Sequence, residues 1–94
     1  MKPPQTLDGA AVLEWVWSDE PFGTLTDEDG TAVCNVHGQA ICQYSGGRGY
    51  YRFSCDRNWT VVQDSDHETI DEAKDAATQL YNVPPRAWHA CTGD

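Results

Sequence analysis

Basic residues are scarce in this chain. Six Lys and Arg stand against 15 Asp and Glu, which gives a formal net charge of -9 at pH 7. Proteins that bind nucleic acids or anionic membranes concentrate Lys and Arg, so the charge disfavours both as direct partners. A net charge this far from zero favours solubility and draws basic partners toward the surface. The composition therefore points to a basic protein or nucleoprotein complex as the partner.

Long apolar segments are also lacking. No run approaches the roughly 18 residues of a membrane span, and Met1–Gln5 contains no apolar core of the kind found in a secretory signal. We therefore expect a cytoplasmic protein whose four cysteines stay mostly reduced. The length of 94 residues predicts one domain with a modest core. Residues 1–9 are expected to be a flexible lead-in and residues 82–94 an irregular tail.

Motifs for catalysis and for cofactors are lacking as well. The sequence Gly-Gly-Arg-Gly at 46–49 does not follow the GxxxxGK[ST] pattern of a phosphate-binding loop and precedes no predicted helix, so it predicts a hairpin loop. Cys55, His67 and Asp56 have the side chains of a nucleophile, a base and an orienting group, but no local signature brings them together. We therefore expect a protein that is not an enzyme and carries no cofactor.

Cysteine and histidine leave a structural zinc site open as an alternative. Cys34-x-x-His37 and His89-x-Cys91 supply two sulfurs and two nitrogens, which suit a tetrahedral zinc site. Their spacing is not that of a familiar zinc finger, and the second pair lies in the expected tail.

A disulfide is the other staple that the cysteines allow. A hairpin centred on Gly38 would place Cys34 opposite Cys42. Opposed strand residues have Cβ atoms about 4.5–5.5 Å apart, so a modest adjustment would close the bridge. Reduced thiols buried as small apolar groups are the other interpretation, and a reducing compartment favours it.

Strand-forming and turn-forming residues alternate over the first two thirds of the chain. They predict strands near residues 13–17, 22–26, 31–36, 39–45, 50–55 and 58–63. Residues 10–17 also fit a short helix capped by Asp8, and this alternative stays open. Asp29-Gly30 predicts a hairpin turn. A sheet with one helix on it has one buried face, so we expect partial exposure among Tyr50, Trp59 and Trp88.

The clearest local pattern begins at residue 69. Thr69 and Glu72 match a capping box, and apolar residues then recur at helical spacing up to Tyr81. Asn82 is suited to a left-handed stop, and Pro84-Pro85 prevents continuation. The predicted fold class is therefore α+β: an antiparallel sheet of four or five strands with one C-terminal helix packed on one face.

Acidic residues are gathered in two parts of the sequence. The first group, called the acidic strip below, comprises Asp64, Asp66, Glu68, Asp71, Glu72 and Asp75. A second group includes Asp27, Glu28 and Asp29, with Asp19 and Glu20 just before them. Acids near a helix N-terminus are favoured by the helix dipole, and acids in turns are simply hydrated, which gives both groups an ordinary structural interpretation. The alternative is that they bind a basic partner, with carboxylates spaced like the phosphates of a nucleic acid.

The small size, the acidity and the strands-then-helix order resemble those of small inhibitors made by phages and mobile elements. These include anti-CRISPR and anti-restriction proteins, and bacterial toxin immunity proteins are similar in the same features. The resemblance carries no motif and transfers no functional residue to this chain. It implies a non-enzymatic inhibitor that blocks a basic, nucleic-acid-handling protein by charge mimicry. A toxin immunity protein, or a small structural module held by zinc or a disulfide, is the alternative.

Overall fold

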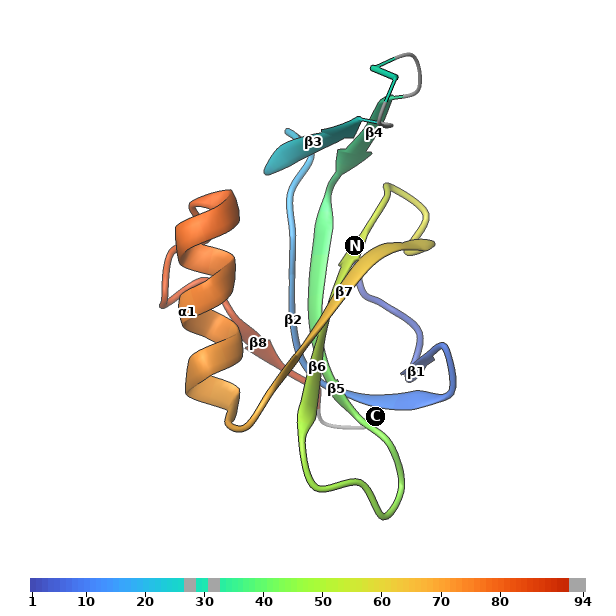
Figure 1. Cartoon of the computed structure of the whole chain (residues 1–94), viewed down its shortest axis with the longest axis vertical. Coiled ribbons are helices and arrows are strands. Elements are labelled where there is room, and N and C mark those ends of the chain that lie inside the picture. Colours follow the sequence, from blue (N-terminus) through green and yellow to red (C-terminus); the bar gives the residue numbers. More distant parts are fainter. Residues whose placement is uncertain (27–28, 31–32, 92–94) are drawn as a thin grey trace.

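Antiparallel strands form a curled sheet with one C-terminal helix on one face, which confirms the predicted fold class (Figure 1). The computed structural model describes residues 1–26, 29–30 and 33–91. The main sheet has the order β1-β2-β5-β6-β7, β8 also pairs with β2, and β3 pairs with β4 in a separate hairpin. The elements are β1 (Thr6–Leu7), β2 (Ala10–Trp17), β3 (Gly23–Thr26), β4 (Val33–Val36), β5 (Gly38–Gln43), β6 (Tyr50–Cys55), β7 (Val61–His67), α1 (Ile70–Tyr81) and β8 (His89–Ala90).

Residues 10–17 form a strand and not the short helix that the sequence left open. β2 is paired along its length with β5 and on its other side with β1 and β8. An irregularity between Val12 and Glu14 shifts the register. A bulge of this kind moves the following side chains to the other face of the sheet, so Val12 lies on one face and Val16 on the other.

Both ends of the chain contain more structure than the sequence predicted. Within residues 1–9, β1 pairs with β2 and Leu7 is buried. Within residues 82–94, Val83 is fully buried and β8 pairs with Glu14 and Trp15 of β2. These short strands have little β propensity of their own and form because β2 offers them an edge, which a local sequence pattern does not reveal.

The hairpin predicted at Asp29-Gly30 is present as the β3–β4 pair, with Gly30 at a φ of 73°. The hairpin predicted around Gly38 is wrong. β4 pairs with β3, whereas β5 pairs with β2 and β6, so Cys34 lies opposite Leu25 and not opposite Cys42. Gly38 is a strand residue against which the Trp59 ring packs, and this close contact explains a glycine there without a turn.

The strand after β6 begins later than the predicted range 58–63 and extends to His67. Asp56 holds residues 56–60 in a loop, so the strand begins only after it, because Asp56 Oδ1 accepts hydrogen bonds of 2.9 Å from the backbone N–H groups of Asn58 and Thr60. Trp59 lies inside this loop at a φ of 64°, a conformation that bulky residues rarely adopt. The loop thereby turns the indole back over β5.

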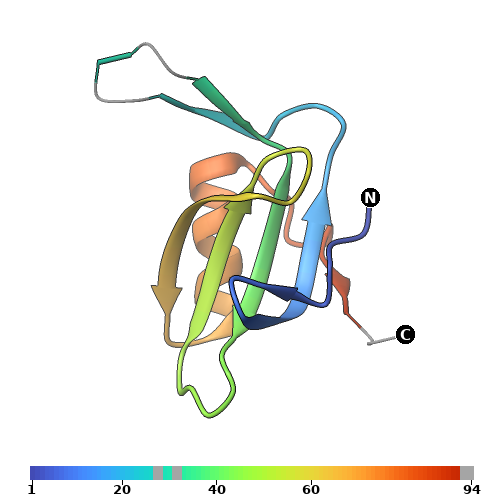
Figure 2. The same cartoon turned by 90° about the vertical axis from the view of Figure 1, so that its right-hand side faces the viewer.

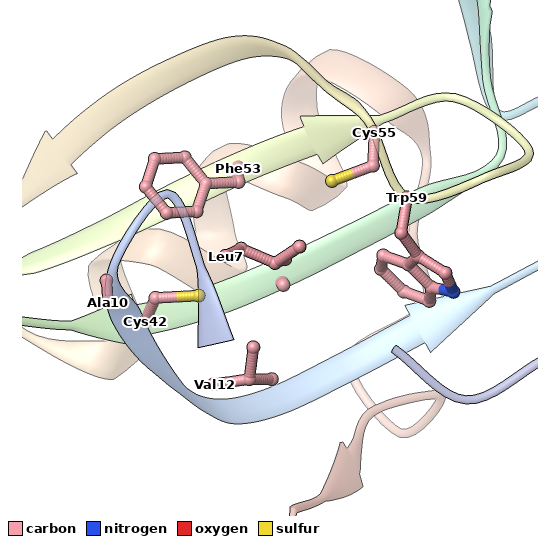
Figure 3. Packing of buried hydrophobic residues seen from close by; sticks show 8 residues of the cluster. Leu7, Ala10, Val12, Cys42, Phe53, Cys55 and Trp59 are labelled. Carbon is pink, nitrogen blue, oxygen red and sulfur yellow. The ribbon is translucent and has the colours of Figure 1, made fainter. Parts of the chain in front are cut away.

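The centre of the sheet is buried on both faces, so the expectation of one buried face is wrong. The face away from α1 carries a first cluster (Figure 3), which consists of Leu7, Ala10, Val12, Ala40, Cys42, Phe53, Cys55 and Trp59. The face toward α1 carries a second cluster, which consists of Val16, Val36, Ala77, Tyr81 and Val83. Trp59 is only 6% exposed, while Tyr50 and Trp88 are half-buried. The N-terminal segment folds back over the first face and acts as a cover that the sequence did not predict (Figure 2).

Helix α1 has the ends that the sequence predicted. Thr69 accepts a hydrogen bond from the backbone N–H of Glu72 at 3.1 Å, and Asn82 is left-handed with a φ of 56°. The Glu72 carboxylate reaches back to the N–H of Glu68 at 3.0 Å, one residue before the cap. Ala73, Ala77 and Tyr81 face the sheet, and their small or flat side chains allow close packing.

An arginine is buried between the sheet and α1. Arg52 is 1% exposed, and its Nη1 donates to Gln39 Oε1 at 2.7 Å and to Ser54 Oγ at 2.8 Å. Its guanidinium lies 5.5 Å from the centroid of the Tyr81 ring. Burial lowers the pKa of Arg52 from its ordinary value, and the Tyr81 phenol partly opposes this shift. Among the described residues, no carboxylate forms a salt bridge with this cation.

The contact between Gly38 and Trp59 gives a test of the first cluster. A Cβ at position 38 would lie 2.7 Å from an indole carbon of Trp59, so Gly38→Ala forces the ring to move. We expect a loss of about 1–3 kcal/mol in the free energy of unfolding, measured by urea denaturation. In a Trp59→Ala background the same substitution should have almost no effect, because the clash is gone. An equal loss in both backgrounds would contradict this packing.

Candidate functional site

The acidic strip lies along β7 and α1 at one edge of the molecule. Among the described residues, β7 is the edge strand at this side of the main sheet, and the chain continues from it through a short turn into α1. All six carboxylate residues of the strip are exposed. The structure therefore places the predicted residues on one continuous segment of surface chain, which comprises β7, α1 and the turn between them, where Glu68 lies.

The two halves of the strip do not share one face. Asp64 pairs with Phe53 and Asp66 with Tyr51, so these two acids lie on the face of the sheet opposite α1. Asp71 and Asp75 lie on the side of α1 away from the sheet, because Ala73, Ala77 and Tyr81 occupy the buried side. The strip therefore wraps around the edge and is not confined to the helix.

Of the second acidic group, Asp19 and Glu20 lie in the turn after β2. The β3–β4 hairpin projects beyond the end of the main sheet (Figure 1). Asp29 lies in the turn of this hairpin. Asp27 and Glu28 lie outside the described residues, so their predicted role as binding residues stays a prediction. The hairpin and the start of α1 lie toward opposite ends of the molecule in both views (Figures 1 and 2).

Few cations of the described chain are placed to neutralise the acidic strip. Lys74 of α1 forms a salt bridge of 2.8 Å with Glu14 of β2, and Arg57 lies 3.7 Å from Asp19. Arg52 is buried under the helix. In the described residues neither salt bridge includes an acid of the strip. Arg48 lines one pocket with Asp66, Glu68 and Glu72 and offsets part of their charge, so the strip as a whole stays negative at this edge.

An open pocket of about 830 Å³ lies where the two halves of the strip meet. We call it the tyrosine–carboxylate pocket. It is formed by the β5–β6 loop and the turn between β7 and α1, which approach each other at one end of the sheet (Figure 1). Its lining residues are Tyr44, Gly47, Arg48, Gly49, Tyr50, Tyr51, Asp66, His67, Glu68 and Glu72.

The tyrosines of this pocket were not predicted as site residues. Tyr44 is 38% exposed, packs edge-on against Tyr51 at 5.3 Å between ring centroids, and donates from its hydroxyl to the carbonyl of Asp8 at 3.1 Å. The signal in the sequence was the position of Tyr44, Tyr50 and Tyr51 on either side of a glycine-rich loop. Strand pairing was needed to bring that loop beside Asp66 and Glu68.

The three residues considered for nucleophilic catalysis are not assembled. Cys55 pairs with Val61 at one end of the β6–β7 ladder, whereas His67 pairs with Tyr50 at the other end. His67 is hydrogen-bonded to Ser65, with 2.7 Å between Nε2 and Oγ. Burial raises the pKa of the Cys55 thiol to about 12, with smaller contributions from Cys42 and nearby carboxylates. At neutral pH this thiol is therefore protonated and a poor nucleophile.

The cysteines and histidines considered for zinc are also separated. Cys34 lies in the β3–β4 hairpin, the His37 ring bonds to the carbonyl of Ser18, and His89 packs on the Trp15 ring. In the part of the chain that the structure describes, no group of three or more potential ligands could hold a metal ion. All four cysteines are free, so the disulfide considered between Cys34 and Cys42 is not formed.

Comparisons of the chain with protein-family models, curated proteins and solved structures find no match in any of the three. Within the described residues, none of the helical structure is long and apolar enough to cross a membrane.

The two buried thiols of the first cluster predict a loss of stability at alkaline pH. Burial raises the pKa of Cys42 and of Cys55 from 9.0 to about 12. Above pH 9 an unfolded chain loses these protons while the folded chain keeps them, so folding is disfavoured as the pH rises from 9 to 12. The loss of unfolding free energy should reach at most about 1.4 kcal/mol per pH unit for each thiol, near the middle of this window.

Denaturation of the wild type and of a Cys42→Ala/Cys55→Ala variant across this pH range measures the effect. The variant should lose stability less steeply with pH, because it lacks the two buried thiols. Cys34→Ala is the control, since Cys34 lies outside the first cluster. Parallel curves for the wild type and the double variant would show that the thiols are not buried in this way.

Proposed function

We propose that this chain is a non-enzymatic binding protein that blocks a basic, nucleic-acid-handling protein or complex with its acidic strip. The observation that carries the proposal is the set of six exposed carboxylates along β7 and α1 that no salt bridge of the described residues engages. Uncompensated surface charge of one sign speeds the encounter with an oppositely charged partner and suppresses association with wrong partners.

The distribution of the cations supports this proposal. Arg52 is buried, and Lys74 and Arg57 form salt bridges with Glu14 and Asp19, which are not acids of the strip. Arg48 is the cation that lines a pocket with strip acids, and it offsets only part of their charge. Helix stability alone does not account for the charge, because Asp71 and Asp75 are one turn apart and repel each other mildly. Asp64 and Asp66 lie on β7, so they are not part of the first helical turn.

Charge mimicry also requires that the partner's phosphate-binding groove accept a protein surface. The strip follows β7 at the edge of the main sheet and then the outer side of α1, so its carboxylates run around one edge of the molecule. An exposed acidic edge of this kind is complementary in charge to a basic groove. The phage or mobile-element inhibitor type fits this mode of action, and it is part of the proposal.

Affinity capture from the source cells, followed by kinetics with the purified partner, tests the proposal. The variant is Asp64→Lys/Asp75→Lys, and the control with the same charge change is Asp19→Lys/Glu20→Lys in the turn after β2. At low salt the first variant should associate about tenfold or more slowly than the wild type, with a weaker dependence on ionic strength. The control should stay close to the wild type, and duplex DNA or RNA should compete with the wild type for the partner.

The proposal is contradicted if the strip variant binds as fast as the wild type at every salt concentration. It is also contradicted if the captured partner has no basic nucleic-acid-binding surface.

A further inference from the structure

We propose that the tyrosine–carboxylate pocket binds a short basic peptide segment of the partner, with one arginine side chain seated against the tyrosines and the carboxylates. This inference rests on the proposed function and names the group that the partner contributes. It concerns a concave site with aromatic walls, to which three of the six acids of the strip also belong: Asp66, Glu68 and Glu72.

The size of the pocket sets the class of occupant. A volume of about 830 Å³ lies in the range of sites that enclose a small molecule or a few side chains. One arginine side chain fills only part of such a space, so the residues next to it must enter as well. Gly47 and Gly49 line the pocket and present backbone there without side chains that would occupy the space.

The chemistry of the walls selects a planar cation. Tyr44, Tyr50 and Tyr51 line the pocket, and the faces of tyrosine rings attract guanidinium groups. Asp66, Glu68 and Glu72 line it as well, with Asp66 directly opposite Tyr51 in the β6–β7 pair, and carboxylates accept paired hydrogen bonds from arginine. A ligand that stacks on an aromatic ring and also donates several hydrogen bonds to carboxylates matches arginine better than any other natural side chain.

The walls are held in place before a ligand arrives. The carboxylate of Glu72 accepts a hydrogen bond from the Glu68 N–H at 3.0 Å, which fixes it at the start of α1. Tyr44 is held by its hydroxyl and by the Tyr51 ring, which stacks in turn on Phe53 of the first cluster. Groups that are already ordered lose less conformational entropy on binding, which favours even a small ligand.

An anion is the competing occupant, because Arg48 and His67 also line the pocket and the loop is rich in glycine. Three carboxylates in the same lining oppose it electrostatically. The start of α1 also borders the pocket, but N–H groups there are already satisfied, because Thr69 Oγ1 accepts from the Glu72 N–H and the Glu72 carboxylate accepts from the Glu68 N–H. Arginine is therefore the favoured occupant.

Titration of the full-length, isotope-labelled protein with small probes tests the proposal by NMR. The probe is a capped Gly-Arg-Gly peptide, and the matched probe replaces arginine with citrulline, which has nearly the same shape and no charge. The arginine peptide should shift amides of residues 44–51 and 66–72, with a dissociation constant of about 1 mM or below. The citrulline peptide and inorganic phosphate should leave these amides unchanged.

Two charge-matched variants then separate the pocket from the strip. Asp66→Asn/Glu68→Gln removes two carboxylates that line the pocket and should weaken the arginine peptide about tenfold. Asp64→Asn/Asp75→Asn removes two acids of the strip that do not line it, and should change the dissociation constant by less than about twofold. Circular dichroism of both variants establishes that they keep the fold.

The proposal is overturned if the arginine peptide causes no shifts, if citrulline or phosphate shifts the same amides, or if the two variants weaken the peptide equally. Failure here would leave the proposed function standing as long as the partner's association still depends on Asp64 and Asp75. Failure of the partner experiment, with the peptide bound in the pocket, would instead show an arginine-binding site without charge mimicry.

Discussion

The pairing of β5 with β6, buried on both faces, is the constraint on which the rest of the structure depends. Ala40 and Phe53 pair on the face covered by the N-terminal segment, and Ile41 and Arg52 pair on the face covered by α1. Neither of the elements that cover these two faces is stable by itself, because β1 is only two residues long and α1 only twelve. The loop that joins β5 to β6 forms one wall of the tyrosine–carboxylate pocket, so the central pair also positions the candidate site.

The same arrangement determines which charges reach the surface. Arg52 is drawn into the layer between sheet and helix, where Gln39, Ser54 and the Tyr81 ring replace part of its hydration. A buried cation without a carboxylate is electrostatically unfavourable, and the lowered pKa of Arg52 reflects this. One of the few basic groups is therefore withdrawn from the exterior, while the acids of β7 and α1 stay exposed. The negative surface follows from where the cations lie as much as from the number of acids.

Local signals in the sequence predicted the local structure well. The cap at Thr69, the stop at Asn82 and the turn at Asp29-Gly30 each depend on neighbours in the chain, and all three were confirmed. The predictions that were wrong or incomplete concern places where contacts with distant segments of the chain determine the local structure. β1 and β8 form only on the edges of β2, Gly38 is explained by the remote Trp59, and the tyrosine–carboxylate pocket needs two loops brought together by strand pairing. The members of the acidic strip were named from the sequence, but the division of these acids between two faces depends on the β6–β7 register.

Native-state hydrogen exchange tests the central role of the β5–β6 pair most directly. If this pair is the last part of the molecule to open, amides of Ile41, Cys42 and Phe53 should exchange only through global unfolding, with a free energy equal to that from denaturation. Amides of α1 and of the short edge strands should exchange faster, through partial opening. Slower exchange in α1 than in β5 and β6 would contradict the account, because the helix would then be stable without the strands on which it packs.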